Sequence, residues 1–207
     1  MTNLTTPPES DPLVKATYAM SEAELEWMVL DHAGLPPDLQ DLEIAREEIL
    51  DNESMAEAGP VGRTATSLEE VGRITGFVRD FGATDATSSQ VLAAATVVHL
   101  FEGHAAVSRW IDDVFVKEML EMHGPDGEGR FLSTEEIAVS GFHDHAAAVH
   151  TTQEAGIGTI SSTIVDFRIG RLLGVAYVVT PGESVQREMA QELAHALERH
   201  IVRVVLG

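Results

Sequence analysis

The stretch "GIGTISSTIVDFRIGRLLGVAYVVT", residues 156–180, decides the fold. Residues 157–167 are rich in Ile, Thr and Val, which favour extended structure. The segment "RIGR" at residues 168–171 is typical of a tight turn, and residues 171–179 then return as a second apolar strand. The stretch therefore predicts an antiparallel hairpin.

Helical patterns follow this hairpin and a similar, earlier one. In residues 184–204, apolar side chains recur at about every fourth position, which is the spacing of an amphipathic helix. Upstream, residues 71–81 and 91–101 have the composition of two strands, and residues 104–122 carry a second apolar helical stripe that includes Trp110. The order strand, strand, helix thus occurs twice, in pseudo-repeat halves at about residues 67–124 and 138–207.

Two amphipathic helices need an apolar surface to cover. We predict an α+β fold in which the four strands form one antiparallel sheet and both helices pack on one face of it. Residues 21–207 are expected to form a single domain.

The N-terminal region differs in composition from the rest of the chain. Residues 1–20 begin with the polar, Thr/Pro-rich "MTNLTTPPESDP" and are expected to be a disordered or linker-like tail. Ser21 and Glu24 have the spacing of a capping box, which predicts a short helix ending near His32. In residues 39–59 we expect an irregular or extended piece followed by a short helix near residues 53–58.

Composition narrows the functional classes. The chain carries 34 acidic and 13 basic residues, a net charge of −21, and no clustered cationic face, which argues against a nucleic-acid partner. It has no cysteine, which excludes disulfides and thiolate metal sites but leaves the compartment open. The longest apolar run, residues 91–101, is far shorter than the ~20 residues of a membrane-spanning helix, so no span is expected in this chain.

Three histidines and an aspartate gather in "GFHDHAAAVH", residues 141–150. On a strand, His143 and His145 would point to the same side and could share one metal ion. His150 stands at odd spacing from both, so no regular element gathers all three. We expect surface histidines near a strand start and no metal ion or other cofactor, with His143 and His145 as the remaining metal candidates.

Catalytic motifs are absent from the sequence. It contains no G-x-S-x-G, and "GIG" at residues 156–158 precedes a strand, whereas a phosphate loop would follow one. Adjacent acids such as Glu135 and Glu136 are expected from the composition alone. We therefore expect no catalytic residues and no enzyme.

The most promising polar residues surround the turn of the second hairpin. Asp166, Arg168 and Arg171 lie there between two apolar strands, in the least acidic third of the chain. The arginines could bind a carboxylate or another anionic group of a ligand. Alternatively, they could pair with the acidic N-terminal segment.

The pieces "FHDHA", "FRIG" and "LAHALERHI", within residues 141–205, resemble the C-terminal part of bacterial extracytoplasmic lipoproteins and of the sensor domain of a mycobacterial serine/threonine kinase. The resemblance implies an antiparallel α+β domain outside the cytoplasm, with a ligand-binding or structural role and no catalysis. It also implies that "FHDHA" is a loop entering a strand. The chain departs from the kinase domains in lacking cysteine, since those domains rely on disulfides, and its N-terminal half has no clear counterpart.

These observations favour a non-catalytic ligand-binding or sensory domain outside the cytoplasm. Its partner would be a small molecule or a protein of unknown identity, bound in a groove between the sheet and its helices. Two alternatives stay open: a structural or assembly subunit without a small-molecule ligand, which would form a homo-oligomer, and a histidine-based metal-binding protein.

Overall fold

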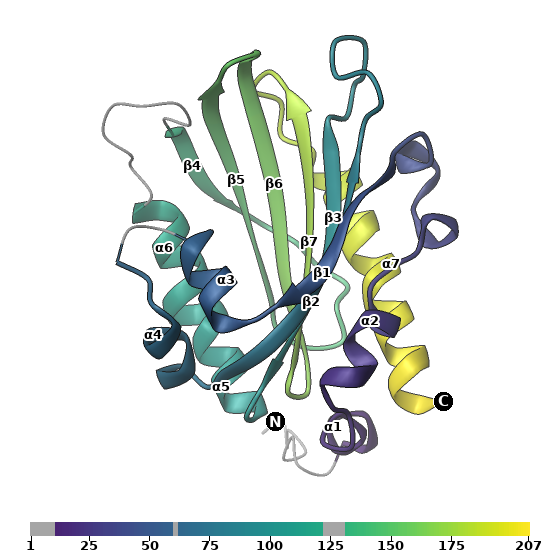
Figure 1. The fold of residues 1–207 in the computed structure, drawn as a ribbon, viewed down its shortest axis with the longest axis vertical. Coiled ribbons are helices and arrows are strands. Elements are labelled where there is room, and N and C mark those ends of the chain that lie inside the picture. Colours follow the sequence, from purple (N-terminus) through teal and green to yellow (C-terminus); the bar gives the residue numbers. More distant parts are fainter. Residues whose placement is uncertain (1–10, 60–61, 122–130) are drawn as a thin grey trace, which may run out of the picture.

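The computed structural model describes residues 11–59, 62–121 and 131–207. Its centre is a single antiparallel sheet of seven strands (Figure 1). In spatial order the strands are β1 (Glu43–Leu50), β2 (Arg73–Gly82), β3 (Ala93–Phe101), β7 (Leu172–Pro181), β6 (Gly158–Ile169), β5 (Ala146–Ala155) and β4 (Phe131–Ile137). The predicted α+β class with an antiparallel sheet is confirmed, and the four predicted strands, β2, β3, β6 and β7, belong to this one sheet.

The β6–β7 hairpin follows the pattern expected from the sequence. The strands pair without a break up to Ile169 and Leu172, so Gly170 and Arg171 alone form the turn. Gly170 has a φ of +56°, a conformation that favours glycine. A Cβ atom at Gly174 would lie 2.2 Å from the Phe167 ring, so this glycine lets the buried ring lie flat against β7.

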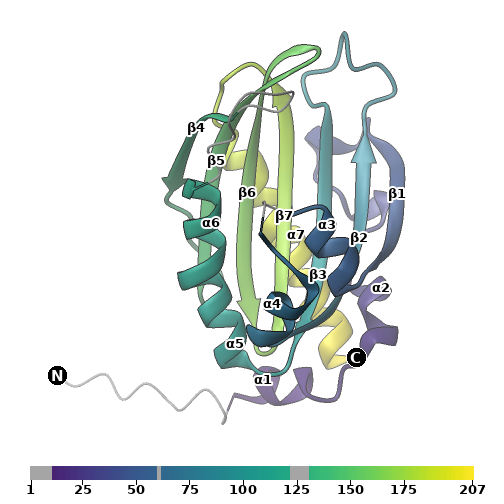
Figure 2. The same ribbon diagram turned by 60° about the vertical axis from the view of Figure 1, so that its left-hand side comes forward.

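Helices cover both faces of the sheet (Figure 2). On one face lie α7 (Arg187–Leu206), α1 (Pro12–Thr17) and α2 (Leu25–Met28). On the other face lie α3 (Asn52–Glu57), α4 (Ala65–Glu70), α5 (His104–Arg109), a π-helical segment (Trp110–Phe115) and α6 (Val116–Glu121). None of the helices in the described ranges is long and apolar enough to cross a membrane.

The expectation that both long helices pack on one face is corrected by this arrangement. Leu172 and Ala176 of β7 point into the core beneath α7, whereas Leu173 points into the core beneath α5 and α6. Central strands with apolar side chains on both faces require cover on both sides. The two amphipathic stripes show that each helix needs a sheet, but they do not indicate which face.

Aromatic packing connects the α7 core with the loop before β5. The ring of Phe167 stacks on Phe142 with a centroid distance of 5.3 Å. Phe142 in turn stacks on the imidazole of His195 in α7, at 4.3 Å. The three rings fix the position of this loop over the helix.

The N-terminal segment contains short helices. Residues 1–10 of the expected linker-like tail lie outside the described residues, while residues 12–17 of it form α1, which Asp11 caps by accepting from the Leu13 amide at 2.8 Å. The predicted capping box is present, because the Glu24 carboxylate accepts from the Ser21 amide at 2.6 Å. A 3₁₀ turn (Glu22–Glu24) leads into α2, which ends at Met28, earlier than expected.

Candidate functional site

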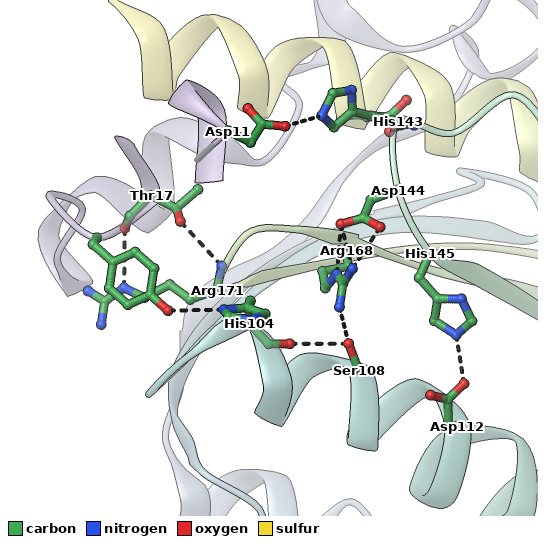
Figure 3. A network of polar contacts seen from close by, with 12 residues as sticks. Asp11, Thr17, His104, Ser108, Asp112, His143, Asp144, His145, Arg168 and Arg171 are labelled. Atoms are coloured by element: carbon green, nitrogen blue, oxygen red, sulfur yellow. Dashed lines mark hydrogen bonds and ion pairs between the residues drawn. The ribbon is translucent and has the colours of Figure 1, made fainter. Parts of the chain in front are cut away.

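Arg171 ties the N-terminal segment to the hairpin turn (Figure 3). Its Nε donates to the carbonyl oxygen of Thr17 at 3.2 Å, and its Nη2 donates to that of Met20 at 2.6 Å. The guanidinium also lies over the Tyr18 ring, 5.5 Å from the centroid. One of the two alternatives was that the arginines pair with the acidic N-terminal segment. Arg171 does contact this segment, but it binds backbone carbonyls and not acidic side chains.

Arg168 connects the loop before β5 to helix α5. It forms a bidentate ion pair with Asp144, with distances of 2.9 Å from Nε to Oδ2 and 2.7 Å from Nη2 to Oδ1. Its Nη1 donates to the Ser108 hydroxyl. Arg168 and Arg171 share no direct partner among the described residues. They are linked indirectly, because Tyr18 beside Arg171 contacts His104, whose carbonyl accepts from Ser108 (Figure 3).

The three histidines of residues 141–150 contact three different partners. His143 lies 3.2 Å from Asp11, and His145 lies 2.7 Å from Asp112 (Figure 3). Both belong to the loop that leads directly into β5, as the resemblance implied. His150 is buried on β5 against Thr163. Within the described ranges, no group of three or more histidine and acidic side chains is placed to hold a metal ion.

Asp166 lies apart from both arginines, buried beneath helix α5 and the π-helical segment. Its Oδ2 accepts a hydrogen bond from the Trp110 indole at 3.1 Å, while its Oδ1 is buried without a partner among the described residues. Burial raises the pKa of Asp166 to about 7, although the Trp110 hydrogen bond and the charge of Arg63 act in the opposite direction. The carboxyl group therefore keeps its proton to a higher pH than an exposed aspartate does.

A cleft of about 400 Å³ opens beside Asp166, between the sheet on one side and helix α3, the π-helical segment and helix α6 on the other. Of the three residues that the sequence suggested for ligand binding, the cleft is lined by Asp166 but not by Arg168 or Arg171. Its walls are mainly apolar, formed by Met55, Val97, Trp110, Phe115, Met119 and Val175. A mainly apolar cavity of this size with a few polar groups is typical of a small-molecule site.

The π-helical segment shapes one wall of the cleft. Six residues, Trp110–Phe115, interrupt the helix that the sequence predicted as one continuous element over residues 104–122. Trp110 and Phe115, the two ends of this segment, both line the cleft. Such segments are rare and occur frequently at functional sites, because the wider turn redirects side chains.

Arg63 reaches the cleft from the connection between α3 and α4. Its guanidinium lies over the indole of Trp110, 5.6 Å from the ring centroid, and Nη2 donates to the Glu118 carboxylate. The Nε atom is buried and has no partner among the described residues. Arg63 and Asp166 therefore each present one unsatisfied polar atom next to the same tryptophan.

His99 and Arg73 form a buried polar pair at the sheet side of the cleft. Nδ1 of His99 accepts from the Arg73 guanidinium, at 3.0 Å from Nη2. Burial, and after it the charge of Arg73, lowers the pKa of His99 well below its ordinary value, so the ring is neutral and carries its proton on Nε2. Gly76 leaves room for this pair, because a Cβ there would lie 2.4 Å from Nδ1 of His99.

Sequence reasoning identified one of these cleft residues, Asp166. It was selected for its place with Arg168 and Arg171 around the hairpin turn, although an aspartate within the apolar strand "TIVDF" is a signal in itself. His99 in "TVVHLF" presents the same kind of signal, a titratable residue within an apolar strand, and could have been found in the same way. Arg63 lies in an irregular segment far from Trp110 in sequence, so no periodicity could have connected the two.

The chain was compared with known proteins. No family model matches it, and no curated protein matches it in sequence. Among solved structures, it is similar to the extracellular domain of PknH from Mycobacterium tuberculosis, with a TM-score of 0.62. The match covers 91% of this chain and 98% of that chain, at 10% sequence identity. The fold is therefore that of an extracellular domain from a mycobacterial kinase, the class to which the sequence resemblance pointed.

Proposed function

We propose that this chain is a ligand-binding or sensory domain without catalytic activity, and that its ligand binds in the cleft between the sheet, helix α3, the π-helical segment and helix α6. The observation that carries the proposal is an apolar cavity lined by Asp166 and Arg63, two residues that each hold a buried side-chain atom, Oδ1 and Nε, without a partner among the described residues. Buried polar groups are nearly always hydrogen-bonded, and each one left unpaired costs about 1–3 kcal/mol. A bound ligand is the simplest source of the missing partners.

A location outside the cytoplasm is part of the proposal. Its support is the fold shared over 91% of this chain with an extracellular domain. The shape of the site favours a small molecule over a protein partner, because a concave cavity of about 400 Å³ encloses a ligand whereas a protein interface is broad and flat.

The experiment is a fragment screen by ligand-observed NMR, with two matched variants. Ala58 is exposed and lines the cleft, so Ala58→Trp places an indole in the entrance. Ala105 is equally exposed on α5 but does not line the cleft, and Ala105→Trp is the control. We expect fragments that bind the wild type and Ala105→Trp but not Ala58→Trp. If both variants retain the same fragments, the cleft is not the binding site.

A further inference from the structure

The sheet side of the cleft carries a straight row of side chains from adjacent strands. In the register of the sheet, Val78 of β2 lies opposite Val97 of β3, and Val97 lies opposite Val175 of β7. The row continues to Glu48 of β1 at one end and to Asp166 of β6 at the other. Directly opposed residues share a face of the sheet, and all five line the cleft. The three valines thus form one apolar strip.

The valine strip, Val78, Val97 and Val175, is level and rigid. Neighbouring strands lie about 4.8 Å apart, so the outer two valines are separated by about 10 Å. Valine side chains are short and restricted at χ1, which gives the strip an even surface. Val78 and Val97 belong to neither of the two apolar cores, and Val175 is partly exposed. A flat, rigid ligand can lie along all three residues, and it loses less conformational freedom on binding than a flexible chain does.

The opposite side of the cleft limits the size of such a ligand. Phe115 of the π-helical segment, Met55 of α3 and Met119 of α6 line it. Methionine side chains are flexible and adapt to the outline of a bound group. A water molecule takes up about 30 Å³ of liquid volume, so about 400 Å³ accommodates about 13 non-hydrogen atoms, or roughly two or three fused rings.

The charges around the cleft cancel. Among the described residues that line it and their direct partners, three are cations and three are ionised acids, namely Arg46, Arg63 and Arg73 against Glu48, Asp80 and Glu118. Burial raises the pKa of Asp166 to about 7, raises that of Tyr177 and lowers that of His99, so these three groups are mainly uncharged at about pH 6. A charged ligand would lose its hydration here without meeting an opposite net charge.

Building on the proposed function, we propose that the ligand of the cleft is an uncharged, flat ring system that lies on the valine strip. The strip favours a planar molecule, the volume limits the number of rings, and the balanced charges select against ionised groups. Any polar substituent of the ligand is uncharged, as a hydroxyl or a carbonyl group is.

A set of matched probes separates the effect of shape from that of charge. Naphthalenemethanol, naphthoate and naphthylmethylammonium share one ring system and differ in charge, while decanol is an uncharged, flexible chain of similar size. Titration calorimetry at about pH 6 measures their affinities. We expect naphthalenemethanol to bind at least about tenfold more tightly than either ion or decanol.

NMR of the valine methyl groups locates the bound ring. A ring that lies flat on the valine strip shifts the methyl signals of Val78, Val97 and Val175 together, because all three lie beneath its face. Val98 and Val178 point to the opposite face of the sheet, into the core beneath α7, and serve as controls. We expect ring-current shifts at the strip and none at the two controls.

A pair of variants tests the strip directly. Val175→Phe raises a bulky side chain from the strip and should weaken naphthalenemethanol at least about tenfold. Val179 lies on the same strand and face and is also partly exposed, but it does not line the cleft, so the control Val179→Phe should bind like the wild type. Thermal unfolding checks that both variants fold. If Val175→Phe does not fold, the methyl shifts of the wild type decide.

Several outcomes overturn the inference. Tighter binding of either ion than of naphthalenemethanol would contradict the charge argument, and equal binding of decanol would contradict the flat shape. Binding of naphthalenemethanol without shifts at the valine strip, or unchanged in a folded Val175→Phe, would place the ring elsewhere. If none of the probes binds, the ligand class is wrong. The fragment screen with Ala58→Trp decides separately whether the proposed function survives.

Discussion

Asp166→Asn is expected to stabilise the free protein, and to do so increasingly as the pH rises. The amide oxygen of asparagine can accept the Trp110 hydrogen bond as Oδ2 does, so the packing of the side chain is preserved. The variant removes the ability of this buried group to ionise and places an amide nitrogen where Oδ1 stands, a change that is the same at every pH. In the wild type, ionisation of Asp166 in the folded state is unfavourable because the group is fully buried.

The direction and size of this change in stability follow from the pKa values of Asp166 in the folded and unfolded states. Its pKa is about 7 in the folded protein and 3.8 ordinarily, so between these pH values the folded state holds a proton that the unfolded state has released. The free energy of unfolding of the wild type therefore falls as the pH rises through this window. At about 1.4 kcal/mol per pKa unit, the full loss is about 4 kcal/mol, of which about 3 kcal/mol falls between pH 5 and pH 8.

Urea denaturation at about pH 5 and pH 8 measures this change, with tryptophan fluorescence as the signal. Subtracting the free energy of unfolding of the wild type from that of the variant cancels the contribution of the other carboxylates. Asp113→Asn, a change at an exposed site, serves as the control. The difference between Asp166→Asn and the wild type should grow by about 3 kcal/mol from the lower to the higher pH. A difference that is the same at both pH values would refute the reasoning.

Three further experiments test the fold by urea denaturation and hydrogen exchange. Gly174→Ala forces a Cβ against the buried phenylalanine ring of β6 and should lower the free energy of unfolding by about 1–3 kcal/mol. In the control Gly82→Ala, the Cβ meets its nearest neighbour at 3.5 Å, so the free energy of unfolding should change by less than about 0.5 kcal/mol. Equal losses in the two variants would contradict the steric argument. A double-mutant cycle with Arg168→Gln and Asp144→Asn should give a coupling energy of about 1 kcal/mol. Because the pair is partly exposed, this energy should be smaller in high salt. A coupling energy of zero would show that the ion pair adds no stability. Arg171→Met removes donors to two N-terminal carbonyls and should speed amide exchange in α1 more than in α7, while unchanged exchange in α1 would mean that other contacts hold the segment.

The elements with strong periodicity were predictable from the sequence, and the edge strands were not. The segment "EIAREEIL" of β1 lies at the edge of the sheet with almost every side chain exposed, so Ile44 and Ile49 do not alternate with buried positions. β4 at the opposite edge, "FLSTEEI", is similarly exposed. Edge strands need no apolar face to pair through their backbones, and charged residues on them discourage aggregation, so their sequences carry little periodic signal.

The cleft could be predicted only in part, because its polar residues are distant in sequence. Asp166 and His99 are visible as titratable residues in apolar strands. Arg63 reaches Trp110 only because α3 and α4 lie on the same face as α5 and α6, and this choice of face depends on which side of the sheet α7 occupies. Hydrophobic patterns determine that both faces are covered, but the assignment of helices to faces arises from the three-dimensional packing.

The alternation of side chains along β6 places neighbouring residues on opposite faces of the sheet. Asp166 points into the cleft, while its chain neighbour Phe167 points to the opposite face, where it stacks on Phe142 and through it on His195 of α7. A shift of the β6 backbone that follows a change at Asp166 necessarily moves Phe167 as well, because tightly packed interiors transmit displacement. Two adjacent residues of β6 thus join the packing of the cleft to the packing of α7.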